Sequence, residues 1–500
     1  MRALLSSVAL ATIMLILFRL LFKDWRKAAL ADTAFLVLFS NYGNVYNLIQ
    51  NHMLLGFNYG RHRILFPLFL VALVVIFIVI TRLKQLPALT AGMNFLGVML
   101  LIFPLYQIIS YQAKAATINT TTLPPTQQTE MQNLELSPGI HPPDIYYIIL
   151  DTYTRDDTLK LYLSYDNSSF IQELESRGFY VADCSLSNYS FTDLSLTTSL
   201  NFNYPEILSS RLVEANKDIS DAYPYLSNNA VVQELRKSGY QFIALESGYS
   251  PTEFTSADVY YSYSGNWKSA FLQESITSFE TLQLNTTAAM LFYEFHSYLP
   301  SQVQKILDAS VVHRDRMLFE LNQLEQMAAL PGPKFVFVHI LAPHNPFVFG
   351  PNGEYITRKT PFTLNDDRDV VTMQDYVTGY RDQVTYLNQR MLTIVDYLIQ
   401  NSATPPVILI QGDHGIPRLA EWDTTILNAY YLPMSDYSEL YETISPVNSF
   451  RVVFNQYFST RMPLLADRSC NTDKNSGPFS CIPVIDPNPS CAAMPGAPNP

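Results

Sequence analysis

Residues 145–151 read IYYIILD, six consecutive apolar residues followed by an aspartate. Similar apolar runs recur later in the chain, at 242–245, 335–341 and 407–410. Continuous runs, in which apolar and polar residues do not alternate, are typical of parallel strands covered on both faces. Stretches with a helical pattern lie between them, at 168–177, 302–330 and 381–400. This order predicts an α/β domain of three layers with a mostly parallel central sheet.

The charges divide the chain into two parts. Only 15% of its 500 residues are charged, which excludes a disordered chain, a coiled coil and a highly charged nucleic-acid-binding protein. Residues 1–112 hold nine Lys/Arg and two Asp, a net charge of +7. Because the total is −12, the other 388 residues carry −19. The chain therefore has an apolar, basic front and an acidic, polar remainder.

Four long stretches of the front part are free of charge or nearly so. They predict transmembrane helices near 3–22, 28–49, 63–81 and 87–110. The second is the most polar, because it ends with Asn41, Asn44 and Asn47. Four such stretches in succession favour a membrane bundle over buried core helices.

The basic residues predict how the bundle is oriented. Lys and Arg concentrate in the turns at 19–27 and 82–84, which the positive-inside rule assigns to the cytoplasm. Everything after residue 112 then lies outside the cytoplasm. The N-terminus, Arg61 and Arg63 also fall on the outer side, so we expect either a helix upstream or a second stretch that does not cross.

The remainder divides into three regions. Residues 113–143 are rich in Thr, Pro and Gln and predict an extended linker. Residues 144–466 form the α/β domain. Residues 467–500 form a tail so rich in proline towards its end that no packed core is expected.

The four cysteines suit an extracytoplasmic location, where disulfides persist. Three lie in the tail, at Cys470, Cys481 and Cys491, and Cys184 lies in the α/β domain. Cys470–Cys481 is a reasonable pair, but the sequence leaves the connectivity open.

Three of the apolar runs lead into side chains that bind metals or phosphate: Asp151, His344, and the pair Asp413 and His414. Ligands bind beyond the carboxyl ends of the strands in open α/β sheets, so these side chains are expected at one edge. Oxygen and imidazole ligands suit one divalent ion, Zn²⁺ or Mn²⁺, with Mg²⁺ as a third candidate. The alternatives are ordinary turn or cap residues. His339 is interpreted as a core residue or a support to a ligand.

Residues 188–201 read NYSFTDLSLTTSLN and are crowded with hydroxyls. Thr192 begins a predicted helix, and Ser195 follows three residues later. A helix N-terminus favours anions, and a metal can convert a hydroxyl into a nucleophile. Plain N-capping by Thr192, Ser195 or Thr197 is the alternative.

These motifs resemble those of the alkaline phosphatase/sulfatase superfamily, and more narrowly the membrane-anchored phosphoethanolamine and glycerol-phosphate transferases of bacterial envelopes. The resemblance covers residues 144–460 and rests on Asp151 with Arg155, Thr192 with Ser195, His344 with Phe347, and Asp413 with His414. It implies an alkaline-phosphatase-like domain in which one metal is held by Asp151, Thr192, Asp413 and His414. It also implies that His344 helps to hold the phosphoryl group.

The function expected from this resemblance is that of a metal-dependent phosphotransferase or phosphodiesterase. Thr192 would attack a membrane-lipid, lipid-linked or envelope phosphodiester, and the phosphoryl group would pass to a glycan or lipid hydroxyl or to water. His344 and Arg155 would contact nonbridging oxygens. For Arg155, an ion pair with Asp156 or Asp157 is the equal alternative.

Two departures from the superfamily's motifs limit which of its activities and metal sites are expected. Residues 184–188, CSLSN, lack the Pro and Arg of a formylglycine sulfatase, and no histidine follows His414, which argues against a site with two or three zinc ions. The rival interpretations are a sulfatase-like hydrolase of another phosphate or sulfate ester, and a non-catalytic membrane-tethered envelope protein that keeps the fold.

Overall fold

The computed structural model describes residues 2–49, 53–54, 57–58, 62–84, 86–118, 134–208, 218–263, 283, 286–291, 309–356, 372–419, 423–434, 436–471, 477–494 and 496. The chain forms two compact units. The first comprises mainly Met1–Ala116 and Asn266–Ala309, and the second mainly Thr117–Gly265, Ser310–Thr360 and Leu364–Pro500.

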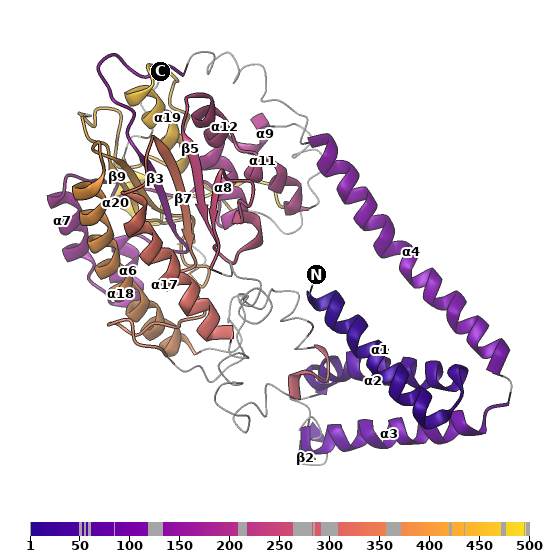
Figure 1. Ribbon diagram of the computed structural model, residues 1–500. Coiled ribbons are helices and arrows are strands. Elements are labelled where there is room, and N and C mark those ends of the chain that lie inside the picture. The colour runs from indigo at the N-terminus through magenta and orange to yellow at the C-terminus, as the bar shows by residue number, and fades with distance from the viewer. Residues whose placement is uncertain are drawn as a thin grey trace. The chain divides into compact units, whose positions relative to one another are not determined.

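The first unit is helical (Figure 1). Its elements are α1 (Arg2–Phe22), α2 (Trp25–Ile49), β1 (Met53–Leu54), β2 (Phe57–Asn58), α3 (His62–Arg82) and α4 (Leu86–Ile118). Among the described residues, three stretches are long and apolar enough to cross a membrane: Leu4–Phe22, His62–Arg82 and Leu86–Ser110. The helix expected at 28–49 is present as α2 but is not one of them, and its asparagines lower its hydropathy.

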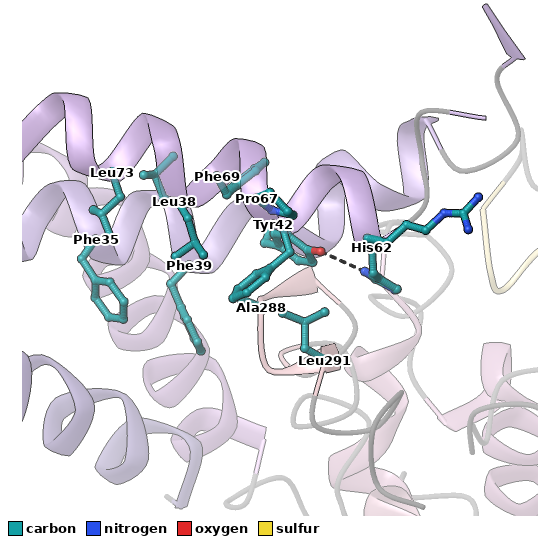
Figure 2. Close-up of a pocket in the computed structure, with 13 residues that line it drawn as sticks. Phe35, Leu38, Phe39, Tyr42, His62, Pro67, Phe69, Leu73, Ala288 and Leu291 are labelled. Atoms are coloured by element: carbon teal, nitrogen blue, oxygen red, sulfur yellow. Dashed lines mark hydrogen bonds between the residues drawn. The ribbon is translucent and has the colours of Figure 1, made fainter. Parts of the chain in front are cut away.

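A cavity of about 720 Å³ lies within this unit, lined mainly by apolar side chains of α2 and α3 (Figure 2). The Tyr42 hydroxyl lies 2.9 Å from His62 Nδ1 and links the two helices. Ala288 also lines the cavity, and its N–H donates to the Phe39 carbonyl of α2 at 2.8 Å. Part of the Tyr-, Ser- and Thr-rich stretch at 250–300 therefore packs on the helices of the first unit.

The second unit contains a sheet of seven strands in the order β4-β9-β8-β3-β7-β5-β6. The strands are β3 (Ile145–Leu150), β4 (Tyr180–Val181), β5 (Gln241–Leu245), β6 (Val259–Tyr261), β7 (Lys334–Ile340), β8 (Val407–Gly412) and β9 (Asn428–Tyr431). The four apolar runs of the sequence are the adjacent parallel strands β8, β3, β7 and β5. Only the β4–β9 and β9–β8 pairs are antiparallel, so the expected mostly parallel sheet is confirmed.

Helices cover both faces of this sheet, which gives the expected three layers (Figure 1). Alternate residues of β3 serve opposite faces: Tyr146 and Ile148 join one hydrophobic core, and Tyr147 and Ile149 the other. The first core includes α6 (Asp156–Leu163), α7 (Ser168–Ser176), α17 (Ala309–Met327) and α18 (Met373–Asn401). The second includes α8 (Thr192–Leu200), α12 (Ala230–Lys237) and α19 (Pro446–Tyr457). Shorter elements are α9 (Pro205–Leu208), η1 (Ile219–Ala222), α11 (Tyr223–Ser227), η2 (Ser250–Thr252), β10 (Cys470–Asn471), β11 (Ile482–Pro483) and α20 (Pro489–Ala492).

The described part of the tail packs on the second unit, contrary to the expectation from its proline content. Cys470 and Phe479 are buried in a small apolar cluster with Leu194 of α8. Two disulfides hold the tail: Cys470–Cys481, as expected, and Cys184–Cys491, which joins it to the α/β domain. Cross-links and a few buried side chains replace the regular core that the composition cannot build.

The predicted linker is also partly structured. α4 continues to Ile118, and Leu134, Leu136 and Ile140 pack against a core of the second unit. Residues 119–133 lie outside the described segments.

Candidate metal centre

Strand order brings the predicted ligands together. β3 lies between β7 and β8, and Leu150 at its end pairs with Ile340 of β7 and with Gly412 of β8. Asp151 follows Leu150, and Asp413 follows Gly412, so the two carboxylates leave neighbouring parallel strands at the same edge of the sheet. The sheet therefore places side by side two residues that are separated by more than half of the chain.

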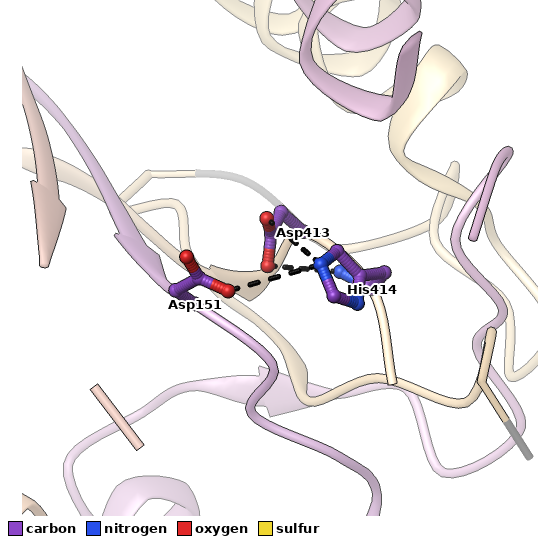
Figure 3. A group of neighbouring side chains, drawn as sticks. All are labelled: Asp151, Asp413 and His414. Carbon is purple, nitrogen blue, oxygen red and sulfur yellow. Dashed lines mark hydrogen bonds and ion pairs between the residues drawn. The ribbon is translucent and has the colours of Figure 1, made fainter. Parts of the chain in front are cut away.

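Asp151, Asp413 and His414 form one buried group (Figure 3). One ligand atom from each lies within 4.8 Å of the others. His414 Nε2 is 3.8 Å from Asp151 Oδ1 and 3.7 Å from Asp413 Oδ2. Within the described residues, Asp151 Oδ1 has no hydrogen-bond partner. A buried carboxylate oxygen without a donor, beside another carboxylate and an imidazole, fits a divalent metal ion.

The carboxylates and histidines of this group shift one another's pKa. Burial raises the pKa of Asp151, but the histidines around it, His344, His339 and His414, outweigh burial and hold the pKa below its ordinary value. Burial lowers the pKa of His414, whereas the carboxylates of Asp413 and Asp151 raise it, with a net increase. The two carboxylates therefore favour positive charge within the group, as a cation-binding site requires.

Thr192 is the hydroxyl that reaches this group. It is the first residue of α8 and is 6% exposed, and its Oγ1 donates to Asp413 Oδ2 at 2.6 Å. The other oxygen of Asp413 accepts from the Thr152 and His414 N–H groups at 2.9 and 3.0 Å. Phe191 occupies the N-cap of α8, and no side chain caps the helix. The Thr192 hydroxyl therefore faces Asp413 and is not a helix cap.

His344 lies on the same edge of the sheet. Its N–H donates to the Asp151 carbonyl at 3.1 Å, and its imidazole contacts the Asn345 carbonyl. The side chain is half-buried, as a residue that meets a bound substrate would be. Its phosphoryl-binding role stays a prediction.

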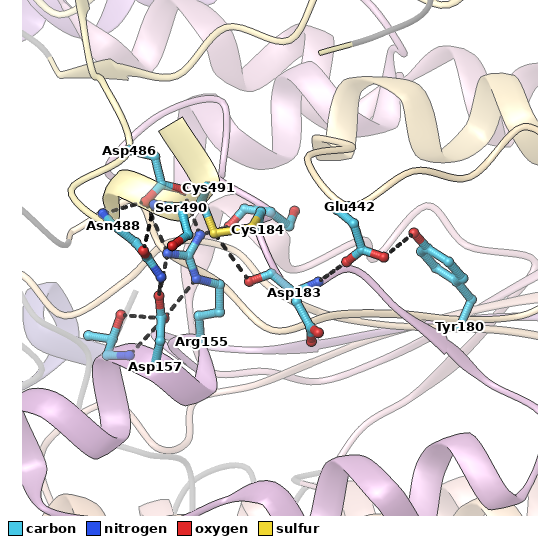
Figure 4. The surroundings of a disulfide bond; sticks show 12 residues. Arg155, Asp157, Tyr180, Asp183, Cys184, Glu442, Asp486, Asn488, Ser490 and Cys491 are labelled. Carbon is cyan, nitrogen blue, oxygen red and sulfur yellow. Dashed lines mark hydrogen bonds and ion pairs between the residues drawn. A yellow bond between two sulfur atoms is a disulfide. The ribbon is translucent and has the colours of Figure 1, made fainter. Parts of the chain in front are cut away.

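Arg155 is engaged elsewhere (Figure 4). Its guanidinium donates to Asp157 at 2.7 and 2.8 Å and to Asp486 of the tail at 2.8 and 3.0 Å. Its side chain is only 4% exposed. Of the two readings of Arg155, the structure therefore has the ion pair with Asp157, extended by Asp486. The phosphoryl-contact role of Arg155 stays a prediction, and its donors bind carboxylates in this structure.

His339, interpreted from the sequence as a core residue or a support to a ligand, lies beside the group, whereas sequence reasoning missed Asp193 and Tyr249. His339 Nε2 lies 3.5 Å from Asp151 Oδ2. Asp193, directly after Thr192, accepts from the Tyr249 hydroxyl at 2.6 Å. Tyr249 lies in the loop after β5, a parallel strand that ends at the same edge. The loop has no charged metal-binding motif, so the signal in the sequence was its position directly after a predicted parallel strand.

Known proteins similar to this chain are found among solved structures. No family model and no curated protein matches the chain. Among solved structures, the zinc complex of the C-terminal periplasmic domain of EcEptC from Escherichia coli is similar at 13% identity, over 65% of this chain and 86% of that one, with a TM-score of 0.40.

Two further structures illustrate the range of matches. The periplasmic domain of phosphoethanolamine transferase EptC from Campylobacter jejuni matches at 12% identity, over 65% and 92% of the two chains, with a TM-score of 0.39. The lipoteichoic acid synthase LtaP from Listeria monocytogenes matches at 11%, over 68% and 76%, with a TM-score of 0.35. Sulfatase structures also match. These matches are distant, and nothing about the function of this chain is taken from them.

Proposed function

We propose that the chain is a membrane-anchored, metal-dependent phosphotransferase or phosphodiesterase with Thr192 as its nucleophile. The observation that carries this proposal is the 2.6 Å hydrogen bond from Thr192 Oγ1 to Asp413 Oδ2, at the edge of the buried Asp151–Asp413–His414 group. A hydroxyl held by a carboxylate at a helix N-terminus, beside three potential metal ligands, is the arrangement that phosphoryl transfer to a side chain requires.

The residues present fit one divalent ion. Asp151, Asp413 and His414 would hold it, and Thr192 lies next to them. When bound, such an ion lowers the pKa of a neighbouring hydroxyl and neutralises charge on a phosphodiester. Zn²⁺ or Mn²⁺ suits two carboxylates and an imidazole, and Mg²⁺ remains a third candidate.

The chain's own residues account for two half-reactions. In the first, Thr192 Oγ1 attacks phosphorus, its proton passes to Asp413, and the bond from phosphorus to the departing alcohol breaks, with that alcohol protonated from solvent. In the second, an acceptor hydroxyl or water attacks the phosphothreonine, the bond from phosphorus to Thr192 Oγ1 breaks, Asp413 returns its proton to Thr192, and the proton of the acceptor passes to solvent. His344 is assigned to the nonbridging oxygens, because it lies at the same edge with a half-buried imidazole.

The helices of the first unit, the disulfides of the second and the basic turns support a proposal for the substrate and the location. In the described part of the chain, three helices that can cross a membrane precede the α/β domain, which favours a membrane lipid or lipid-linked donor and a lipid or glycan acceptor. The two disulfides of the second unit favour an extracytoplasmic site. The basic turns at 19–27 and 82–84 favour the same orientation.

A substrate comparison tests this function against its two rivals. The full chain, purified in detergent and loaded with Zn²⁺ or Mn²⁺, would be assayed on an aryl phosphodiester and an aryl sulfate. The proposal expects diesterase activity that is lost in Thr192→Ala. Sulfate hydrolysis alone would indicate a sulfatase-like enzyme. The absence of both activities and of bound metal would indicate a non-catalytic protein.

A further inference from the structure

The loop after β5 touches the metal centre at two separate points. It comprises Ser247–Thr252 and includes η2. One contact reaches a metal-ligand candidate through a histidine, and the other reaches the nucleophile's helix through a tyrosine. Neither belongs to the residues that the motifs singled out.

The first contact runs from Thr252 through the His339 ring to the carboxylate of Asp151. Thr252 Oγ1 lies 3.0 Å from His339 Nδ1, and His339 Nε2 lies 3.5 Å from Asp151 Oδ2. His339 is fully buried. With Nδ1 bonded to the Thr252 hydroxyl, Nε2 is the ring nitrogen that faces the Asp151 carboxylate. Ser247 Oγ lies 2.9 Å from Thr252 Oγ1 and is hydrogen-bonded to it.

The second contact fixes the start of α8. The Tyr249 hydroxyl donates to Asp193 Oδ1 at 2.6 Å, and the Tyr223 hydroxyl donates to Asp193 Oδ2 at a longer 3.4 Å. Asp193 directly follows Thr192, so its position limits where the nucleophile can stand. The Tyr249 ring also meets the His339 ring edge to face, with 5.9 Å between centroids.

The loop itself is held in one conformation. Gly248 has φ +81°, and a Cβ at that position would lie 2.0 Å from the Arg316 guanidinium carbon. Only glycine accommodates both the positive φ and this close approach. The Gly248 N–H also donates to Glu253 at 2.5 Å. A loop whose backbone is fixed in this way can hold the side chains that it contacts in defined positions.

We infer that Ser247–Thr252 is a positioning element for both halves of the site. Through Thr252 and His339 it orients Asp151 for the metal, and through Tyr249 and Asp193 it sets the position of Thr192. This inference rests on the proposed function. The inference adds that the two contacts have separable effects. The first contact supports metal affinity, and the second supports turnover.

The first contact is tested by metal affinity. Replacing His339→Gln or Thr252→Val in the full chain is expected to weaken Zn²⁺ binding by about 10–100-fold, the usual cost of losing a group that orients a metal ligand. Competition with a chromophoric chelator measures the affinity. Thr158→Val is the matched control, because Thr158 is as buried as Thr252 but its hydroxyl contacts Thr425, away from the loop. Thr252→Val covers the case in which His339→Gln fails to fold.

The second contact is tested by turnover on the aryl phosphodiester. Tyr249→Phe keeps the ring on His339 and removes the hydroxyl, and it is expected to lower kcat by about 10–100-fold through misplacement of Thr192, with Zn²⁺ affinity unchanged. Tyr223→Phe, which removes the longer bond, is expected to have a smaller effect.

The outcomes separate this inference from the proposed function. If wild type binds no metal and has no activity, the proposed function fails. If wild type is active but Zn²⁺ affinity in Thr252→Val and His339→Gln equals that of wild type, the positioning role of the first contact is overturned. An unchanged kcat in Tyr249→Phe overturns the second.

Discussion

The Thr192 hydroxyl donates a 2.6 Å hydrogen bond to Asp413 Oδ2, across 221 positions of the sequence. Thr192 begins α8 on one face of the sheet, and Asp413 follows strand β8, which lies next to the central strand β3. The contact therefore depends on the packing of α8 against the sheet, and the chemistry of the site depends on that packing.

The first prediction concerns the identity of the nucleophile. Thr192→Val, which keeps the shape and removes the hydroxyl, is expected to reduce diesterase kcat by at least about 1,000-fold, because the covalent step is lost. Thr192→Ser is expected to retain measurable activity. The matched control is Thr198→Ala, since the Thr198 hydroxyl bonds to the Leu194 carbonyl within the same buried helix. Activity in Thr192→Val comparable to that of Thr198→Ala would contradict the assignment.

The second prediction concerns metal removal. Dialysis against a chelator is expected to abolish diesterase activity, and adding Zn²⁺ or Mn²⁺ should restore it with one ion per chain. Asp413→Asn is expected to lose the ion, because the amide removes a charged ligand. Elemental analysis of the purified chain measures the stoichiometry. Asp396→Asn is the control, since Asp396 pairs with Arg177 elsewhere on the domain. Two or more ions per chain would contradict the single-ion site.

The third prediction concerns Arg155. Arg155→Gln is expected to lower the free energy of unfolding by about 3–5 kcal/mol, because it leaves the buried Asp486 carboxylate without its partner. Arg177→Gln, which breaks more exposed ion pairs, is expected to cost about 0–1 kcal/mol. Chemical denaturation in detergent measures both. Loss of turnover in folded Arg155→Gln, at unchanged stability, would instead favour the phosphoryl-contact role of Arg155.

The fourth prediction concerns pH. Burial raises the pKa of Asp157, but the Arg155 guanidinium outweighs burial, and the pKa lies below its ordinary value of 3.8. A carboxyl with a lowered pKa in the folded state stabilises the fold above its ordinary pKa, and this stabilisation is lost as the pH falls through the folded-state pKa. Wild type should therefore be more stable than Asp157→Asn near neutrality, and the two unfolding curves should converge below about pH 4. A difference in stability that persists at pH 2 would contradict this account.

The fifth prediction concerns the tail. The double variant Cys184→Ser with Cys491→Ser is expected to destabilise the chain by about 2–5 kcal/mol, because it removes a cross-link that closes a long loop. Limited proteolysis should then cut the tail earlier than in wild type. Equal rates of cleavage would show that the ion pair of Arg155 with Asp486 is sufficient to hold the tail.

Much of the fold could be predicted from local pattern. The four apolar runs are the central parallel strands because a strand buried on both faces needs apolar residues at every position. Strand β9, which lies between β4 and β8, was missed, because NAYY at 428–431 is short and its burial depends on neighbours. The tail was misjudged because proline content reports on regular structure and carries no information about cross-links.

The sequence by itself determined which residues follow the strands: Asp151, Asp413 and His414, and hence the type of metal that could bind. Only the tertiary structure decided which hydroxyl reaches them, that Arg155 pairs with Asp157 and Asp486, and that His339 and Tyr249 support the site. The physical reason is that strand ends are positioned by local pairing rules, whereas side chains from loops and helix ends meet only when both layers of helices pack on the sheet.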